Sequence, residues 1–255
     1  MGNDIESILD GGGIWPYGNP GKPLHSFQES AGHRFKTILP GLPNRLDVLA
    51  PLTSPWQGVA LLNFFQQNNL VGVGSGFLCQ RDVLVTAGHN LTGAIYDAMG
   101  IWMAIDAQSN SNVTPLVPLA YAIHRTLDIA ILILPSQRQG AFTLGGALPP
   151  AGATVTLAGY ALPYADGTVR LSYAAGPLVQ AGAENLLSYR INTREGDSGA
   201  PVFVTTGNST RAIGVHTKSG ANLQTGNIGV PLNAPAIQDL STMIDWARAQ
   251  IGGNQ

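Results

Sequence analysis

The hydrophobic residues of this chain fall into short runs separated by Gly, Pro, Asn and Gln, a pattern that predicts β-strands joined by turns. About six runs precede residue 135: Gly58–Phe65, Leu70–Cys79, Val83–Ala87, Met99–Ile105, Leu119–His124 and Asp128–Leu134. About six more follow residue 150: Ala153–Tyr160, Thr168–Tyr173, Leu186–Ile191, Ala200–Val204, Arg211–His216 and Gly226–Pro231. Two such sets around a linker predict two β-barrels.

The last part of the chain changes from the period of a strand to that of a helix. Its apolar stripe consists of Ile237, Leu240, Ile244 and Ile251. Asn233 can cap the start of a helix, Pro235 suits an early helical position, and Gly252-Gly253 can end it.

These patterns divide the chain into five parts. They are a leader at 1–46, an N-terminal barrel at 47–135, a linker at 136–150, a C-terminal barrel at 151–233 and a helix at 234–251. The leader is rich in Gly and Pro and has little periodicity, which is typical of an extended arm. Two interpretations stay open for it: a pro-segment that is removed, or a tail that lies on the surface.

Composition narrows the class of protein. Of the 255 residues 44% are hydrophobic, enough for a sizeable core, and 11% are charged, with a net charge of −2. No basic stripe occurs, so we expect no nucleic-acid partner. No run reaches the ~18 apolar residues of a membrane span, so we expect no membrane partner. Cys79 is the only cysteine, which excludes a disulfide within the chain. We expect Cys79 to be a small buried hydrophobic residue.

The first residues lack the basic start and apolar stretch of a secretory signal. The compartment therefore stays open: secretion, if a signal has been removed, or an intracellular protein, or one exported by a non-standard route.

Three polar residues carry the candidate chemistry. Ser198 lies in the run Gly196-Asp197-Ser198-Gly199-Ala200-Pro201-Val202, His89 ends the run Thr86-Ala87-Gly88-His89, and Asp128 begins an apolar strand. Serine becomes a nucleophile when a base takes its proton and backbone N–H groups hold the oxyanion. Glycines beside Ser198 allow the sharp turn that aims such N–H groups at one point.

The sequence contains no motif for binding zinc or a phosphate group. The chain has no His-Glu-x-x-His for zinc and no Gly-x-x-x-x-Gly-Lys for phosphate. We therefore expect neither a metal nor an organic cofactor.

The chain order His89, Asp128, Ser198, together with the motifs around them, resembles the chymotrypsin-like serine proteases over roughly residues 48–250. The resemblance implies an all-β fold of two six-stranded antiparallel barrels with a C-terminal α-helix. It also implies a monomer that cleaves polypeptides. His89 would be the general base, Asp128 its orienting partner and Ser198 the nucleophile, with the N–H groups of Gly196 and Ser198 as the oxyanion hole.

Residues near Ser198 narrow the resemblance to the bacterial glutamyl endopeptidases, which cleave after Glu. Thr193 and His216 match the hydroxyl and imidazole that hold the substrate carboxylate there, and Asn192 offers a basic side chain no counter-charge. Thr217 would begin an edge that pairs with the substrate backbone. Two alternatives stay open: a pocket for small or apolar residues, or a catalytically silent barrel that serves as a binding module.

Asp197 departs from the usual glutamyl endopeptidase pattern, which has a neutral residue there. A buried carboxylate needs a partner. The hypothesis is that Arg170 or Arg190 pairs with Asp197, or that cleavage within residues 1–48 frees an amine that does so and makes the chain a zymogen.

Overall fold

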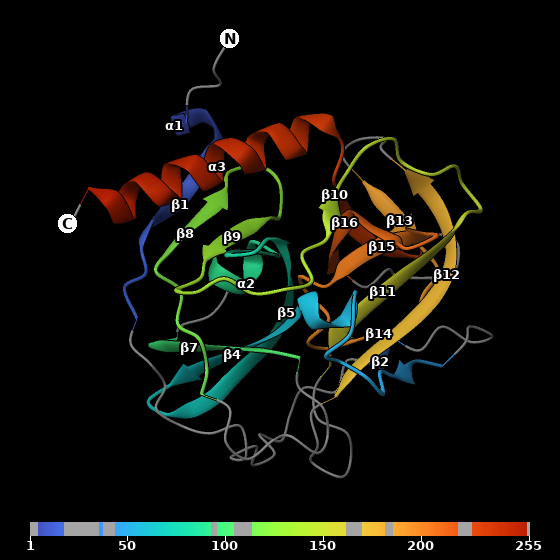
Figure 1. Cartoon of the computed structure of the whole chain (residues 1–255), viewed down its shortest axis with the longest axis horizontal. Coiled ribbons are helices and arrows are strands. Elements are labelled where there is room, and N and C mark those ends of the chain that lie inside the picture. The colour runs from blue at the N-terminus through green and yellow to red at the C-terminus, as the bar shows by residue number, and fades with distance from the viewer. Residues whose placement is uncertain are drawn as a thin grey trace.

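The computed structural model describes residues 5–17, 36–37, 44–92, 96–104, 114–161, 170–181, 186–218 and 226–253. Two β-sheet units lie side by side, and a long helix crosses the outer face of the first (Figure 1). Ile105 and residues 168–169, which the sequence pattern assigns to strands, lie outside the described residues.

The first unit is an antiparallel sheet in the order β1-β8-β9-β6-β5-β4-β7. Its strands are β1 (Leu9–Ile14), β4 (Val59–Gln66), β5 (Asn69–Gln80), β6 (Val83–Thr86), β7 (Ala98–Met103), β8 (Ala120–His124) and β9 (Ala130–Ile133). Gln67 and Asn68 turn the chain between β4 and β5 at positive φ, the conformation that a tight hairpin requires. Beyond β7, an isolated bridge joins Ile101 to Leu116.

The second unit closes on itself. Its strands are β11 (Thr154–Tyr160), β12 (Leu171–Ala181), β13 (Leu187–Tyr189), β15 (Pro201–Thr206), β16 (Ser209–Lys218) and β17 (Asn227–Pro231). They pair in the order β16-β15-β11-β12-β13-β17, and β17 pairs again with β16, which makes a six-stranded antiparallel barrel. Two short strands join it from outside: β3 (Leu46–Asp47) on β12, and β10 (Thr143–Leu144), from the linker, parallel to β16.

Helices complete the fold. α3 (Ala234–Gly252) starts as the sequence predicts, because the Asn233 side chain accepts a hydrogen bond from the Ala236 N–H. α1 (Ile5–Ile8), α2 (His89–Thr92) and the 3₁₀ turn η1 (Trp56–Gly58) are short. The chymotrypsin-like all-β fold with a C-terminal helix is therefore confirmed, and the second unit is the predicted six-stranded barrel. The first unit differs: it is a seven-stranded sheet in which β1 is an extra edge strand, and no pairing among the described strands joins β1 to β7.

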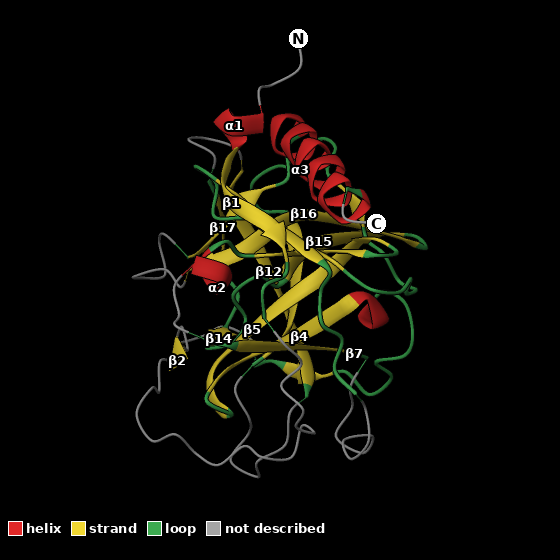
Figure 2. Ribbon diagram, turned by 90° about the vertical axis from the view of Figure 1, so that its left-hand side faces the viewer, coloured by secondary structure: helices red, strands yellow, loops and turns green. Residues whose placement is uncertain are grey.

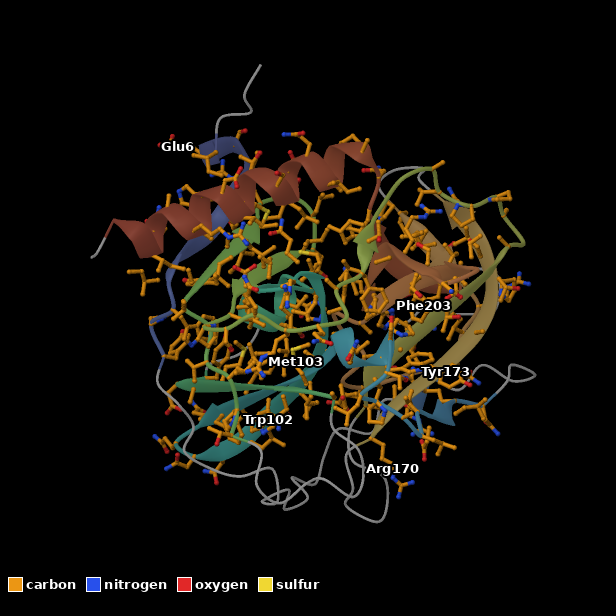
Figure 3. The ribbon with its side chains drawn as sticks, in the orientation of Figure 1. Glu6, Trp102, Met103, Arg170, Tyr173 and Phe203 are labelled. Atoms are coloured by element: carbon orange, nitrogen blue, oxygen red, sulfur yellow. The ribbon has the colours of Figure 1, made fainter. Side chains whose placement is uncertain are left out.

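Aromatic rings join the two units. Phe142, in the linker, packs against Phe77 of β5 and Phe203 of β15, with ring centroids 5.5 and 5.4 Å apart. Trp56 contacts Phe203 and Tyr173 of β12. Figure 3 shows Phe203 and Tyr173 in the second unit and Trp102 in the first. Because these contacts bury apolar surface from both units, they hold the first sheet and the barrel in one relative position.

The described part of the leader is built into both units. β1 pairs with β8, and Ile8 and Trp15 are buried in the core. A side chain at Gly12 would meet the Trp246 ring of α3 at 2.6 Å, so only glycine lets β1 lie this close to α3 (Figure 2). Further along, β2 (Lys36–Thr37) pairs with β14 (Thr193–Arg194) next to the Ser198 turn. Sequence reasoning did not predict these strands.

No helix among the described residues is long and apolar enough to span a membrane.

Candidate active site

His89 lies in α2, directly after the end of β6, and faces Asp128 at the start of β9. The Asp128 carboxylate accepts two hydrogen bonds from His89: the ring Nδ1–H at 2.8 Å and the backbone N–H at 2.8 Å. Gly88 allows this approach, since a side chain there would meet Asp128 Oδ1 at 3.2 Å. With Nδ1 donating, the other ring nitrogen of His89 is left as the acceptor that a general base needs.

The electrostatics of Asp128 suit an orienting carboxylate. Burial raises its pKa, but the hydrogen bonds and charge of His89 outweigh burial, and the charge of Lys218 adds to them, so the pKa lies below its usual value. Asp128 therefore stays ionised across the neutral pH range and remains an acceptor for both N–H groups of His89.

Ser198 lies on a tight turn between β14 and β15. Gly196 and Gly199 have φ values of 95° and 88°, a region that favours glycine, as the sequence pattern indicates. A side chain at Gly196 would meet the Tyr160 carbonyl at 2.6 Å, and one at Gly199 would collide with the Ser75 carbonyl. Both glycines are therefore required by space as well as by backbone angle.

Around this turn, the N–H groups of Gly196 and Ser198, which the sequence predicts as the oxyanion hole, donate no backbone hydrogen bond to any described residue. Among the same residues, no hydrogen bond joins the Ser198 hydroxyl to the His89 ring. Such bonds are often long in a free enzyme and shorten when substrate binds.

Two residues that sequence reasoning missed fix the turn to the first sheet. The Asn90 amide, next to the candidate base, donates to the Ser198 carbonyl at 2.9 Å and to Thr86 Oγ1 at 2.9 Å. Ser75 donates its backbone N–H to the Ser198 carbonyl at 2.8 Å and its hydroxyl to the Gly196 carbonyl at 2.7 Å. The position of Asn90 beside His89 was the one sequence signal for this role.

The partner of Asp197 is Arg45, at the end of the leader. Arg45 Nη1 donates to Asp197 Oδ2 at 2.8 Å, and their side chains are 1% and 0% exposed. The prediction that Arg170 or Arg190 pairs with Asp197 is therefore wrong for the uncut chain, and the alternative of an amine freed by cleavage stays a prediction. Arg170 instead pairs with Asp47 at 3.1 Å, at the edge of β12 (Figure 3). Nothing in the leader pattern distinguishes Arg45, because its partner Asp197 lies 152 residues further along the chain.

Asp197 also accepts the Arg194 N–H at 2.8 Å, so the same carboxylate holds both the leader and the turn before Ser198. Burial raises the pKa of Asp197, while the charge of Arg45 and the Arg194 N–H act against burial. The balance leaves the pKa above its usual value, so the Arg45 guanidinium is the counter-charge that the ionised form of this buried carboxylate requires.

The candidate specificity residues lie on either side of the turn. Thr193, on β14, is fully buried, and His216, on β16, is 3% exposed. His216 Nδ1 lies 2.5 Å from the Tyr189 hydroxyl of β13. Burial, together with the charges of Arg45 and His89, lowers the pKa of His216 to about 3, so the ring is neutral at pH 7.

Thr217 follows His216 at a bulge in the pairing of β16 with β17. Its hydroxyl donates to the Ile228 carbonyl at 3.4 Å, so the side chain hydrogen-bonds to the neighbouring strand β17. Only its backbone is left for a substrate strand. Ser219 and Gly220, which continue the edge suggested by the sequence, lie outside the described residues.

The Cys79 thiol is unsuited to nucleophilic chemistry. Burial raises the pKa of the Cys79 thiol to about 12, which keeps it protonated and a weak nucleophile. No group of three or more His, Cys, Asp or Glu among the described residues could hold a metal ion.

Fold and site define a class of protein, the chymotrypsin-like serine proteases. A family model described as the trypsin-like peptidase domain matches residues 74–215, and the chain belongs to this family. No curated protein matches the chain in sequence.

Among solved structures, the fold is similar to that of a Glu endopeptidase determined in complex with MPD. The two chains share 18% sequence identity with a TM-score of 0.64, over 80% of this chain and 98% of the other. At this identity the likeness establishes the fold and leaves the bond that is cut to be argued from this chain's own residues.

Replacing Arg45 tests the buried ion pair. We expect Arg45→Met to lower the free energy of unfolding by about 3–5 kcal/mol, because Asp197 loses its counter-ion. We also expect kcat to fall by about 10²-fold as the Ser198 turn loses its anchor. Chemical denaturation and peptide hydrolysis measure the two effects.

Arg170→Met is the matched control. Its pair with Asp47 is partly exposed and should contribute about 0–1 kcal/mol, with no loss of kcat. If Arg45→Met is as stable and as active as Arg170→Met, the anchoring role assigned to Arg45 is wrong.

Proposed function

We propose that this protein is a serine endopeptidase whose catalytic triad is His89, Asp128 and Ser198. One observation carries the proposal: a single carboxylate, Asp128, accepts both the ring N–H and the backbone N–H of His89 at 2.8 Å. This arrangement fixes both the position and the tautomer of the His89 ring. A catalytically silent binding module has no need of it.

In the proposed reaction, His89 takes the hydroxyl proton of Ser198 as the oxygen attacks the peptide carbonyl. The N–H groups of Gly196 and Ser198 then hold the oxyanion. His89 returns the proton to the leaving amine, and an acyl-enzyme remains on Ser198. Water, deprotonated by His89, hydrolyses this ester and restores the serine.

For specificity, the proposal is cleavage after Glu or Asp, with Thr193 and His216 holding the substrate carboxylate. Burial raises the pKa of Tyr189 well above its usual value, and the charge of Asp197 adds to this, so its hydroxyl keeps its proton. In the proposed arrangement that proton is donated to His216 Nδ1, which leaves the N–H on Nε2. A neutral His216 can therefore act as a hydrogen-bond donor to a carboxylate, and the backbone at Thr217 would pair with the substrate strand.

The proposal also holds that the chain needs no cleavage to become active. Arg45 already supplies the cation that Asp197 requires, at 2.8 Å and without contact with solvent. The described leader residues 44–46 are then part of the working enzyme.

Cleavage of a peptide panel that varies only the residue before the scissile bond tests the mechanism and the pocket together. We expect hydrolysis after Glu, less after Asp, and a loss of about 10⁴-fold or more in Ser198→Ala. Cleavage after small or apolar residues would be consistent with the triad but would contradict the assignment of Thr193 and His216 as the residues that hold a substrate carboxylate. Equal rates in Ser198→Ala and the unaltered protein would contradict the triad.

Tyr189→Phe tests how His216 recognises the carboxylate. Losing the donor frees His216 to place its proton on either nitrogen, so we expect the preference for Glu over Gln to fall about tenfold, the value of one hydrogen bond. Because His216 is neutral at pH 7, the same preference in the unaltered protein should stay constant from about pH 6 to about pH 9.

The control for this variant is Tyr173→Phe, in which the ring that packs on Trp56 is kept. It should leave the preference unchanged. A preference that disappears as the pH rises from about 6 to about 8 would mean that His216 acts as a cation, contrary to the proposal.

A further inference from the structure

The loop His124–Asp128, between β8 and β9, presents the carboxylate that orients His89. It is closed by the His124 N–H, which donates to the Ile129 carbonyl at 2.9 Å. Within it, the Ile129 N–H donates to the Leu127 carbonyl at 2.7 Å, which places Asp128 at the centre of a three-residue turn. The position of the carboxylate therefore depends on how firmly residues 125–127 are held.

The His124 ring fills the inside of this loop. Its Nδ1 accepts the backbone N–H groups of Thr126 at 3.2 Å and Leu127 at 3.0 Å. A ring nitrogen that accepts two N–H groups cannot carry a proton, so the proton of neutral His124 is on Nε2. The contact has the geometry of an Asx turn, in which a side-chain acceptor holds the N–H groups two and three residues further on.

Asp239 fixes this arrangement from the C-terminal helix. Its carboxylate lies 3.2 Å from His124 Nε2, and the two side chains are 19% and 7% exposed. α3 packs across β8 and β9, so Asp239 is presented to the loop by a rigid element (Figure 1). An acceptor at Nε2 keeps the proton there and leaves Nδ1 free to hold the loop.

We propose that His124 is a positioning residue for Asp128, and that Asp239 of α3 sets the tautomer in which it works. The inference rests on the proposed triad, because it assigns a function to the position of Asp128. It connects the C-terminal helix to the catalytic centre through two side chains and one loop. An error of about 1 Å in the placement of a catalytic group can cost 10²-fold in rate, so this support matters for turnover.

Two substitutions of His124 separate its acceptor from its bulk. In His124→Asn the side-chain oxygen occupies nearly the place of Nδ1 and can accept the same two N–H groups, whereas His124→Leu fills the space without an acceptor. We expect His124→Leu to lower kcat by about 10- to 100-fold with KM changed by less than about twofold. We expect His124→Asn to recover kcat to within about threefold of the unaltered protein.

Controls separate positioning from general loss of stability. Ile131→Val removes a methyl group from the core of β9 and should leave kcat unchanged. On the helix, Asp239→Asn should lower kcat several-fold, whereas Asp245→Asn, at an exposed position of α3, should not.

Proton NMR gives a readout that does not need catalysis. The Nδ1–H of His89, hydrogen-bonded to Asp128, should give a strongly deshielded resonance that persists in His124→Asn and broadens or shifts in His124→Leu. If the unaltered protein and Ser198→Ala cleave equally, the proposed function fails, and the resonance still tests the position of Asp128. Unchanged kcat and resonance in His124→Leu, or equal losses in both His124 variants, would overturn the inference.

Discussion

A buried carboxylate next to the candidate nucleophile sets the main constraint on this structure. Asp197 has no access to solvent, and its ionised form needs a counter-ion that is also buried. Arg45 meets this need and extends the contact, because its guanidinium also donates to the Ser172 hydroxyl and to the carbonyls of Ser172 and Gly159. One side chain thus joins the leader, β11, β12 and the Ser198 turn.

The candidate active site is divided between the two units. His89 and Asp128 lie at strand ends of the first sheet, and Ser198 lies on a turn of the second. Phe142 packs between the units, while Ser75 and Asn90 donate directly from the first sheet to the Ser198 and Gly196 carbonyls. Because these contacts are short and buried, the relative position of the candidate base and the candidate nucleophile follows from the packing of the whole domain.

Local signals in the sequence explain most of what could be predicted. Short apolar runs predicted the strands, and the capping residue Asn233 predicted the start of α3. The glycines at 196 and 199 predicted the turn at Ser198. Each of these features depends on residues that are close together in the chain. Contacts between distant residues carried no such signal, which is why Arg45, Tyr189 and His124 were missed. Strand β1 was also missed, because its Gly11-Gly12-Gly13 segment has no apolar side chains to form a pattern. The segment pairs with β8 through its backbone, and Gly12 packs against Trp246.

The most direct test of the account is active-site labelling of the whole, uncut chain with a fluorophosphonate, followed by intact-mass analysis and peptide mapping. The account predicts one adduct per chain, on Ser198, in molecules that still begin at Met1 and retain Arg45. Absence of an adduct, or labelling that appears only in molecules that have lost Arg45, would contradict it.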